Sequence, residues 1–168
     1  MRESATVPYM NNTLGAGRIA FGLASLGLLF GAVVHVFAWW AGPDWMAWLG
    51  APPSVVASRA AKSWPAWAGT LILAGGLAAL AALCGIPARG GMHRMALGVL
   101  ALLFVARGLL VLPYWAGLRD LRTPFGHFVV LGGSFAPGSL VVLAIGLLVA
   151  GGLLGTRPHR LTSSRADP

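Results

Sequence analysis

The feature that most constrains this chain is a long apolar run with one arginine inside it. The run extends from Met95 to Trp115, and Arg107 is its only charged residue. Because an α-helix rises about 1.5 Å per residue, this run is long enough to cross the roughly 30 Å hydrocarbon core of a bilayer. An arginine within a span is unfavourable by about 2.5–3.5 kcal/mol on insertion scales, so it requires water or a partner. The run predicts a transmembrane helix with Arg107 as a candidate site residue.

The composition of the whole chain indicates a membrane protein. Of its 168 residues, 57% are hydrophobic and only 10% are charged, which is too apolar for a soluble domain of this size. Apolar runs at about 19–40, 66–86, 95–115 and 138–155 fill most of it. We therefore predict an all-α membrane protein whose residues 18–155 form a four-transmembrane-helix bundle. The lone Cys84 lies inside an apolar run, and we expect it to be a packing residue.

The remaining segments are short. We expect residues 1–17 to be a mobile tail and residues 156–168 to be a basic tail. The connection 41–65 is broken by prolines and carries Trp45 and Trp48, so we expect part of it to lie in the membrane interface. Residues 128–136 are apolar but interrupted by glycines. We interpret them as a dipping or interfacial segment, although they are also compatible with the start of the fourth span.

The basic residues indicate which way the chain crosses the membrane. The formal charge of +8 does not indicate nucleic acid, because the basic residues stand singly between apolar runs. With four spans, the side of the termini holds seven arginines and the other side four basic residues, which predicts cytoplasmic termini in a bacterial inner membrane. All seven tryptophans fall at the second side or at the span ends next to it. We expect a binding site on that outer side, and we expect His93 and His159, on the inner side, to be surface residues.

Two polar residues in the spans are candidates for that site. Gly27 and Gly31 form a GxxxG pattern that permits close helix approach, and His35 lies one turn further on the same face. Arg107 lies about 18 Å from the inner end of its span, in the same outer half. A shared polar site of His35 and Arg107 and a separate structural role for each residue both remain open. Tyr114, two turns after Arg107, extends this site or belongs to the aromatic belt.

Other chemistry has weaker support in the sequence. Asp120 lies in a mixed-charge loop with Arg119, Arg122 and His127, which either caps the site or is a solvated loop. His35 and His127 are conceivable axial ligands of a haem, but His127 is outside the spans. No helix carries a pair of metal ligands at the required spacing, and no serine or cysteine has an activating histidine nearby. We therefore predict no catalytic residues, metal or cofactor.

Several short motifs resemble a known family. They are His35 followed by Trp39 and Gly42-Pro43, the pair Arg107-Gly108, Thr123-Pro124-Phe125, and Ser134-Phe-Ala-Pro137 before the last span. Together these motifs, across roughly residues 20–155, resemble a group of small bacterial four-span integral membrane proteins described as a domain of unknown function. The resemblance implies a four-helix membrane fold and no particular activity. The sequence departs from the family pattern after Arg107, where Leu109 to Leu112 stand in place of acidic residues.

These observations support two functional hypotheses. The first is a small binding or accessory protein in the lipid bilayer, with an outward-facing polar pocket for a lipid-like or anionic ligand, or a surface for a partner subunit or a second copy. The alternative is a membrane-embedded enzyme or a redox protein, binding haem or quinone, that uses His35. Binding residues in either case are His35, Arg107, Tyr114 and Asp120.

Overall fold

The computed structural model describes residues 9–87, 90–123, 126–130 and 132–156. In chain order the elements are α1 (Tyr9–Ala41), α2 (Pro43–Trp48), α3 (Pro53–Ala60), α4 (Trp64–Gly85), α5 (Gly91–Leu109), α6 (Val111–Trp115), β1 (Asp120–Thr123), β2 (Gly126–Val129) and α7 (Phe135–Gly155).

The prediction of an all-α bundle with four transmembrane helices is confirmed. Within the described residues four helical stretches are long and apolar enough to cross a membrane: Gly15–Ala41, Trp64–Gly85, Gly91–Trp115 and Phe135–Gly155. Each coincides with a predicted span to within a few residues. The predicted mobile tail is wrong for residues 9–17, because α1 already begins at Tyr9.

The third span is not one continuous helix. α5 ends at Leu109, and after Leu110 a short helix, α6, continues to Trp115. Pro113 explains the break, because its ring cannot donate a backbone hydrogen bond and clashes with the carbonyl four residues earlier, that of Leu109. Tyr114 therefore lies in α6, beyond this break, while Arg107 lies in α5.

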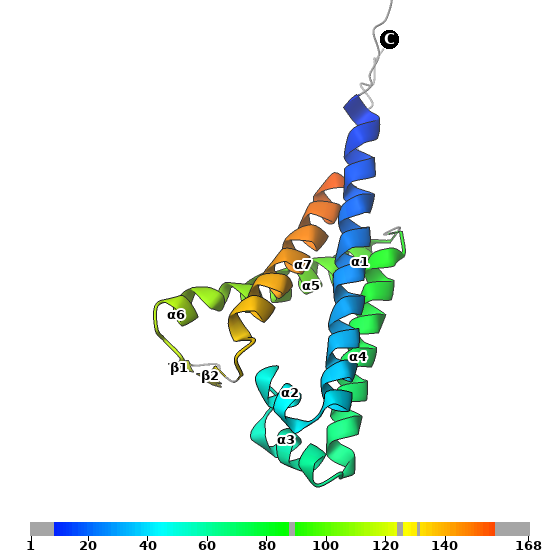
Figure 1. The fold of residues 1–168 in the computed structure, drawn as a ribbon. Coiled ribbons are helices and arrows are strands. Elements are labelled where there is room, and N and C mark those ends of the chain that lie inside the picture. Colours follow the sequence, from blue (N-terminus) through cyan, green and yellow to red (C-terminus); the bar gives the residue numbers. More distant parts are fainter. Residues whose placement is uncertain (1–8, 88–89, 124–125, 131, 157–168) are drawn as a thin grey trace, which may run out of the picture.

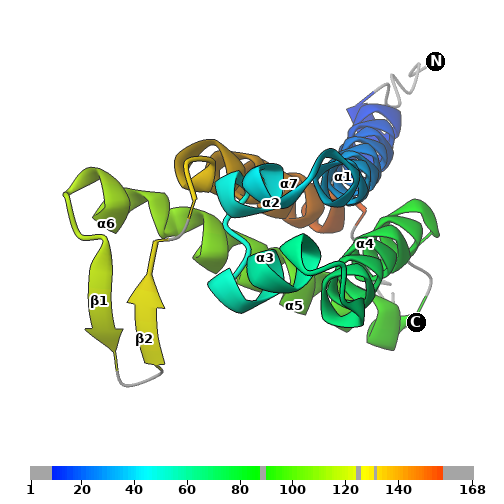
Figure 2. The ribbon, with the colours of Figure 1, turned by 60° about the horizontal axis from the view of Figure 1, so that its bottom comes forward.

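The spanning helices form two pairs that meet at one end and diverge at the other (Figure 1). α1 packs along α4 and α5 packs along α7, while α7 also contacts α1 and α4 scarcely touches α5. The start of α1 and the end of α7 lie at the closed end, and α2 and α3 lie at the open end (Figure 1). Figure 2 shows that the β1–β2 hairpin projects beyond α6, away from α1 and α4.

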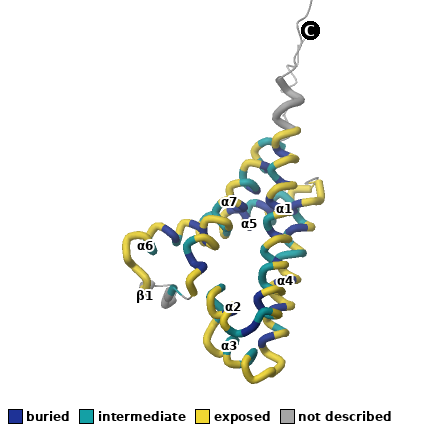
Figure 3. The backbone as a smooth tube through the Cα atoms, viewed as in Figure 1, coloured by how far each residue is buried: buried dark blue, intermediate teal, exposed yellow. Residues whose placement is uncertain are grey.

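The main core lies where the two pairs meet. Its buried residues come from all four spans: Phe21, Ala24, Leu28, Ala81, Cys84, Leu97, Leu100, Ala101, Ile145 and Val149. Cys84 is a free thiol within this core. The outer sides of the helices are exposed, as Figure 3 shows along α1 and α4, and many of the exposed side chains are large and apolar. A bundle in a bilayer retains such surfaces because lipid chains cover them.

Glycines set the close contact between α5 and α7. A Cβ at Gly108 would lie 2.5 Å from Leu143 Cβ, and one at Gly146 would lie 2.8 Å from the backbone nitrogen of Val105. The two backbones can pack this closely only because neither glycine has a side chain. Gly151, further along α7, takes no part in such a contact, because a Cβ there would meet nothing within 4 Å.

The connection between the first two spans is folded into two short helices. Gly42 has φ of +122°, a value that favours glycine, and this turns the chain from α1 into α2. The guanidinium of Arg59, in α3, donates from Nε to the carbonyl of Trp39 at 2.8 Å and lies over the Trp39 ring. Arg59 thus satisfies a free carbonyl at the end of α1, where the helix dipole also favours a cation.

Basic residues also cap helices at the closed end. Arg94 donates to the carbonyl of Leu153 at 2.7 Å and to that of Thr156 at 3.2 Å, at the end of α7. Nε2 of His93 donates to the carbonyl of Leu83 at 2.9 Å, at the end of α4. The interpretation of His93 as a plain surface residue is therefore wrong.

The segment before the last span contains a β-hairpin. β1 pairs with β2 in antiparallel register, with Asp120 opposite Val129 and Thr123 opposite Gly126. Residues 128 and 129 therefore belong to a strand, whereas 135 and 136 already belong to α7. The alternative that this segment starts the fourth span therefore holds only for 135 and 136, and neither strand was foreseen from the sequence.

Candidate functional site

A cavity of about 600 Å³ lies between the diverging helix pairs. We call it the large cavity. Its walls come from four places in the fold: Phe30, Val34, His35 and Phe37 of α1; Trp45, Trp48, Leu49 and Gly50 of α2 and the following turn; Arg107 of α5; and Ser134, Phe135, Pro137, Gly138, Val141 and Val142 at the start of α7. Apolar walls with a few polar groups are typical of ligand sites.

Arg107 is the cation of the large cavity. Its Nη1 donates to the Ser139 hydroxyl at 2.9 Å, and its Cζ lies 4.8 Å from the centre of the Phe135 ring. Ser139 is fully buried and donates in turn to the Phe135 carbonyl at 2.7 Å. Within the described residues the guanidinium has no carboxylate partner, and this one hydrogen bond leaves most of its N–H donors available.

Two rings stacked between two cations lead from Arg107 to the residue that precedes the hairpin. Tyr114 lies 5.3 Å from Phe135, centre to centre, and the guanidinium of Arg119 lies 5.2 Å from the centre of the Tyr114 ring. The order is therefore Arg107, Phe135, Tyr114, Arg119. Each cation lies over a ring face at the distance at which a cation–π attraction operates.

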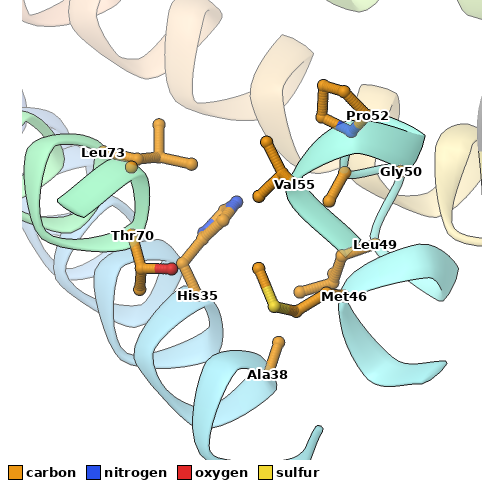
Figure 4. A pocket seen from close by; sticks show the side chains of 11 residues that line it. His35, Ala38, Met46, Leu49, Gly50, Pro52, Val55, Thr70 and Leu73 are labelled. Atoms are coloured by element: carbon orange, nitrogen blue, oxygen red, sulfur yellow. The ribbon is translucent and has the colours of Figure 1, made fainter. Parts of the chain in front are cut away.

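His35 lies between the large cavity and a second one of about 260 Å³, which we call the small cavity. Nδ1 of His35 donates to the carbonyl of Gly31, one turn earlier in α1, at 2.7 Å. Figure 4 shows the imidazole projecting from α1 into the small cavity, between Thr70 and Leu73 on one side and Val55 and Met46 on the other. The two cavities share His35, Leu49 and Gly50.

Contacts between α2 and the start of α7 close the cavity at one edge. The carbonyl of Trp48 accepts hydrogen bonds from the Ser134 backbone nitrogen at 3.1 Å and from its hydroxyl at 2.9 Å. Gly132, with φ of +79°, packs so closely that a Cβ there would lie 2.5 Å from the Trp48 carbonyl oxygen. Only glycine suits this position, both for its backbone conformation and for the space.

The predicted site residues differ in whether they lie on the wall of the large cavity. His35 and Arg107 both line the large cavity, although no hydrogen bond joins them in the described part of the chain. Tyr114 lies one ring behind the wall, against Phe135. Asp120 is exposed in β1 and is not a wall residue of either described cavity, and His127 belongs to β2.

Three important residues were missed by the sequence reasoning. Ser139 and Phe135 hold Arg107, and Trp48 joins α2 to α7. The polar residue Ser139 in the first turns of an apolar span was a usable signal, because a buried hydroxyl needs a hydrogen-bond partner. Nothing in the sequence indicated that Phe135 would be next to Arg107.

The chemistry of the site follows mainly from Arg107 and His35. Arg107 offers positive charge and N–H donors, and His35 offers an imidazole edge. In the described residues, no group of three or more His, Cys, Asp or Glu side chains is placed to hold a metal ion. The arrangement is suited to binding an oxygen-bearing group at the edge of an apolar cavity.

Comparison with known proteins does not add to this description. No protein-family model, no curated protein and no solved structure matches the chain.

Proposed function

We propose that this protein binds a lipid-like molecule in the large cavity, with Arg107 holding an oxygen-bearing or anionic headgroup. The observation that carries the proposal is a guanidinium without a carboxylate partner among the described residues, on the wall of an otherwise largely apolar cavity. A volume of about 600 Å³ falls in the range of small-molecule sites, roughly 300–1,000 Å³. The apolar walls suit acyl or prenyl chains.

We further propose that the protein lies in a bacterial inner membrane with both termini in the cytoplasm. The distribution of arginines supports this orientation. In that orientation the open end, with α2, α3 and the cavities, faces the outer leaflet. Exposed Trp45 and Trp48 at this end are residues typical of the lipid headgroup region.

Native mass spectrometry from a mild detergent tests the binding proposal. Wild-type protein should carry a bound lipid-like molecule, and Arg107→Leu should lose it. Arg18→Leu is the matched control, because Arg18 is an exposed arginine of α1 outside both cavities. The same spectra report whether the protein is a monomer, a homo-oligomer or a complex with a partner subunit. Equal retention in all three proteins would refute the assignment of Arg107.

Thermal unfolding of the same variants separates binding from a merely tolerated arginine. If Arg107 has no role, Arg107→Leu removes an unfavourable charge of about 2.5–3.5 kcal/mol and stabilises the protein. If it holds α7 and a ligand, the change removes a charged hydrogen bond of about 1.5–3 kcal/mol and the bound molecule, so the stability gain disappears or reverses. Combining it with His35→Leu tests coupling, since residues that share a ligand give non-additive changes.

A further inference from the structure

His35 and Arg107, on the wall of the large cavity, differ in hydrogen-bonding character. The partner of His35 Nδ1 is a carbonyl oxygen, which can only accept, so Nδ1 carries the proton. In the neutral ring, Nε2 then has a lone pair and accepts a hydrogen bond. No residue in the described part of the chain donates to Nε2. The cavity thus presents an acceptor at His35 and donors at Arg107.

The walls around these groups favour a flat ring. Five aromatic side chains line the large cavity: Phe30, Phe37, Trp45, Trp48 and Phe135. Phe37 and Trp45 meet edge to face at 5.5 Å, and Trp45 and Trp48 do so at 5.8 Å. Aromatic walls bind another ring by stacking and edge contacts, in addition to burying apolar area. A phosphate headgroup would use Arg107 but would gain nothing from these rings.

We propose that the lipid-like ligand is a quinol, a hydroxylated aromatic ring with a prenyl chain, and that His35 selects its reduced form. A hydroxyl of the ring donates to Nε2 of His35, while the other ring oxygen accepts from Arg107. An oxidised quinone has no hydroxyl group, and a carbonyl placed against the Nε2 lone pair makes no hydrogen bond. A site built to bond a hydroxyl rejects the analogue that lacks it, because the buried acceptor is left unpaired. This inference rests on the proposed function and specifies its ligand.

His35 lies on the wall between the large and the small cavity, and the small cavity also fits the proposal that His35 accepts from a quinol hydroxyl. The small cavity of about 260 Å³ continues the space beyond the imidazole, and apart from His35 the nearest polar side chain on its wall is Thr70. The Thr70 hydroxyl donates to the carbonyl of Ala66 at 2.9 Å, so its proton is already used and its oxygen can only accept from a ligand. The imidazole of His35 and the hydroxyl of Thr70 therefore both present acceptors in this part of the site, which suits a ligand that brings a hydroxyl.

The test is binding of ubiquinol-2 and ubiquinone-2 to the full-length protein in detergent, by quenching of tryptophan fluorescence and by native mass spectrometry. The quinol is kept reduced by excess reductant, and the same reductant without quinol is the blank. Wild-type protein should bind quinol about tenfold or more tightly than quinone, the difference expected for one buried hydrogen bond. Equal binding of the two forms, or tighter binding of quinone, would overturn the proposal.

Variants test whether His35 causes the preference for quinol over quinone. His35→Phe should bind both forms equally, while His35→Gln, which keeps an acceptor oxygen, should retain part of the preference. Val36→Phe is the matched control, since it adds a ring at the neighbouring exposed residue outside the cavities. A preference unchanged in His35→Phe would overturn the role of His35. If a variant does not fold, the wild-type comparison still decides the proposal.

A third ligand separates this proposal from the proposed function. Phosphatidylglycerol is offered to the wild type and to Arg107→Leu under the same conditions. Arg107-dependent binding of phosphatidylglycerol without binding of either ubiquinol-2 or ubiquinone-2 would overturn the quinol proposal and leave the proposed function standing. Binding of none of the three ligands would overturn both.

Discussion

Replacing Gly108 with alanine tests whether the close packing of α5 on α7 positions Arg107. The added methyl carbon would lie 2.5 Å from Leu143 Cβ, 2.6 Å from its Cα and 2.7 Å from its backbone nitrogen. Carbon atoms in contact prefer about 3.5–4.0 Å, so the helices must move apart by about 1 Å. Because two of the three atoms belong to the α7 backbone, a change of side-chain rotamer cannot relieve the overlap.

The expected loss of stability is the difference between two effects. Overpacking a tight contact costs about 1–3 kcal/mol, and replacing glycine by alanine inside a helix returns up to about 1 kcal/mol. We therefore expect Gly108→Ala to destabilise the protein by about 1–2 kcal/mol. For a protein of this size, that corresponds to a decrease in Tm of about 2–8 °C.

Gly98→Ala is the matched control in the same helix. A Cβ at Gly98 would meet nothing within 4 Å, so this variant gains helix propensity without overlap, and its Tm should stay constant or rise. Thermal unfolding in detergent, followed by circular dichroism, measures both. The movement of α5 away from α7 should also lengthen the hydrogen bond from Arg107 to Ser139, so the Gly108→Ala protein should retain less of the bound lipid. Equal Tm values for the two variants would refute the assignment of Gly108 as a close helix contact.

Three further predictions follow from the packing and the topology. Gly31→Leu should lower the Tm more than Gly22→Leu, because a Cβ at Gly31 already lies 3.5 Å from a side chain of α4 while one at Gly22 meets nothing; equal decreases would contradict this packing. Arg94→Leu should lower the Tm by about 2–6 °C, because it removes the cap at the end of α7, and an unchanged Tm would show that the cap contributes nothing. Reporter fusions after Arg89 should give a cytoplasmic signal and fusions within 54–58 an external one, and the reverse pattern would place the cavities on the cytoplasmic side.

The membrane fold could be predicted from the sequence because it depends on local properties. The length and hydrophobicity of each run decide whether a helix can cross a bilayer, and neither quantity depends on neighbouring helices. Prolines near the span ends, such as Pro65 and Pro87, also mark boundaries through their own backbone chemistry. The break at Leu110 was open to the same reasoning, since it depends only on Pro113.

The candidate site required the tertiary structure. The sequence located Arg107 and His35 as polar residues in apolar spans, because a charge or imidazole there is unusual whatever surrounds it. It did not indicate Ser139 or Phe135 as the partners of Arg107, because those contacts depend on how α7 crosses α5. That crossing is decided by Gly108 and Gly146 together, on different helices, and the cavity exists because the two helix pairs diverge beyond it. Packing between distant segments has no counterpart in local composition, so only the folded chain determines it.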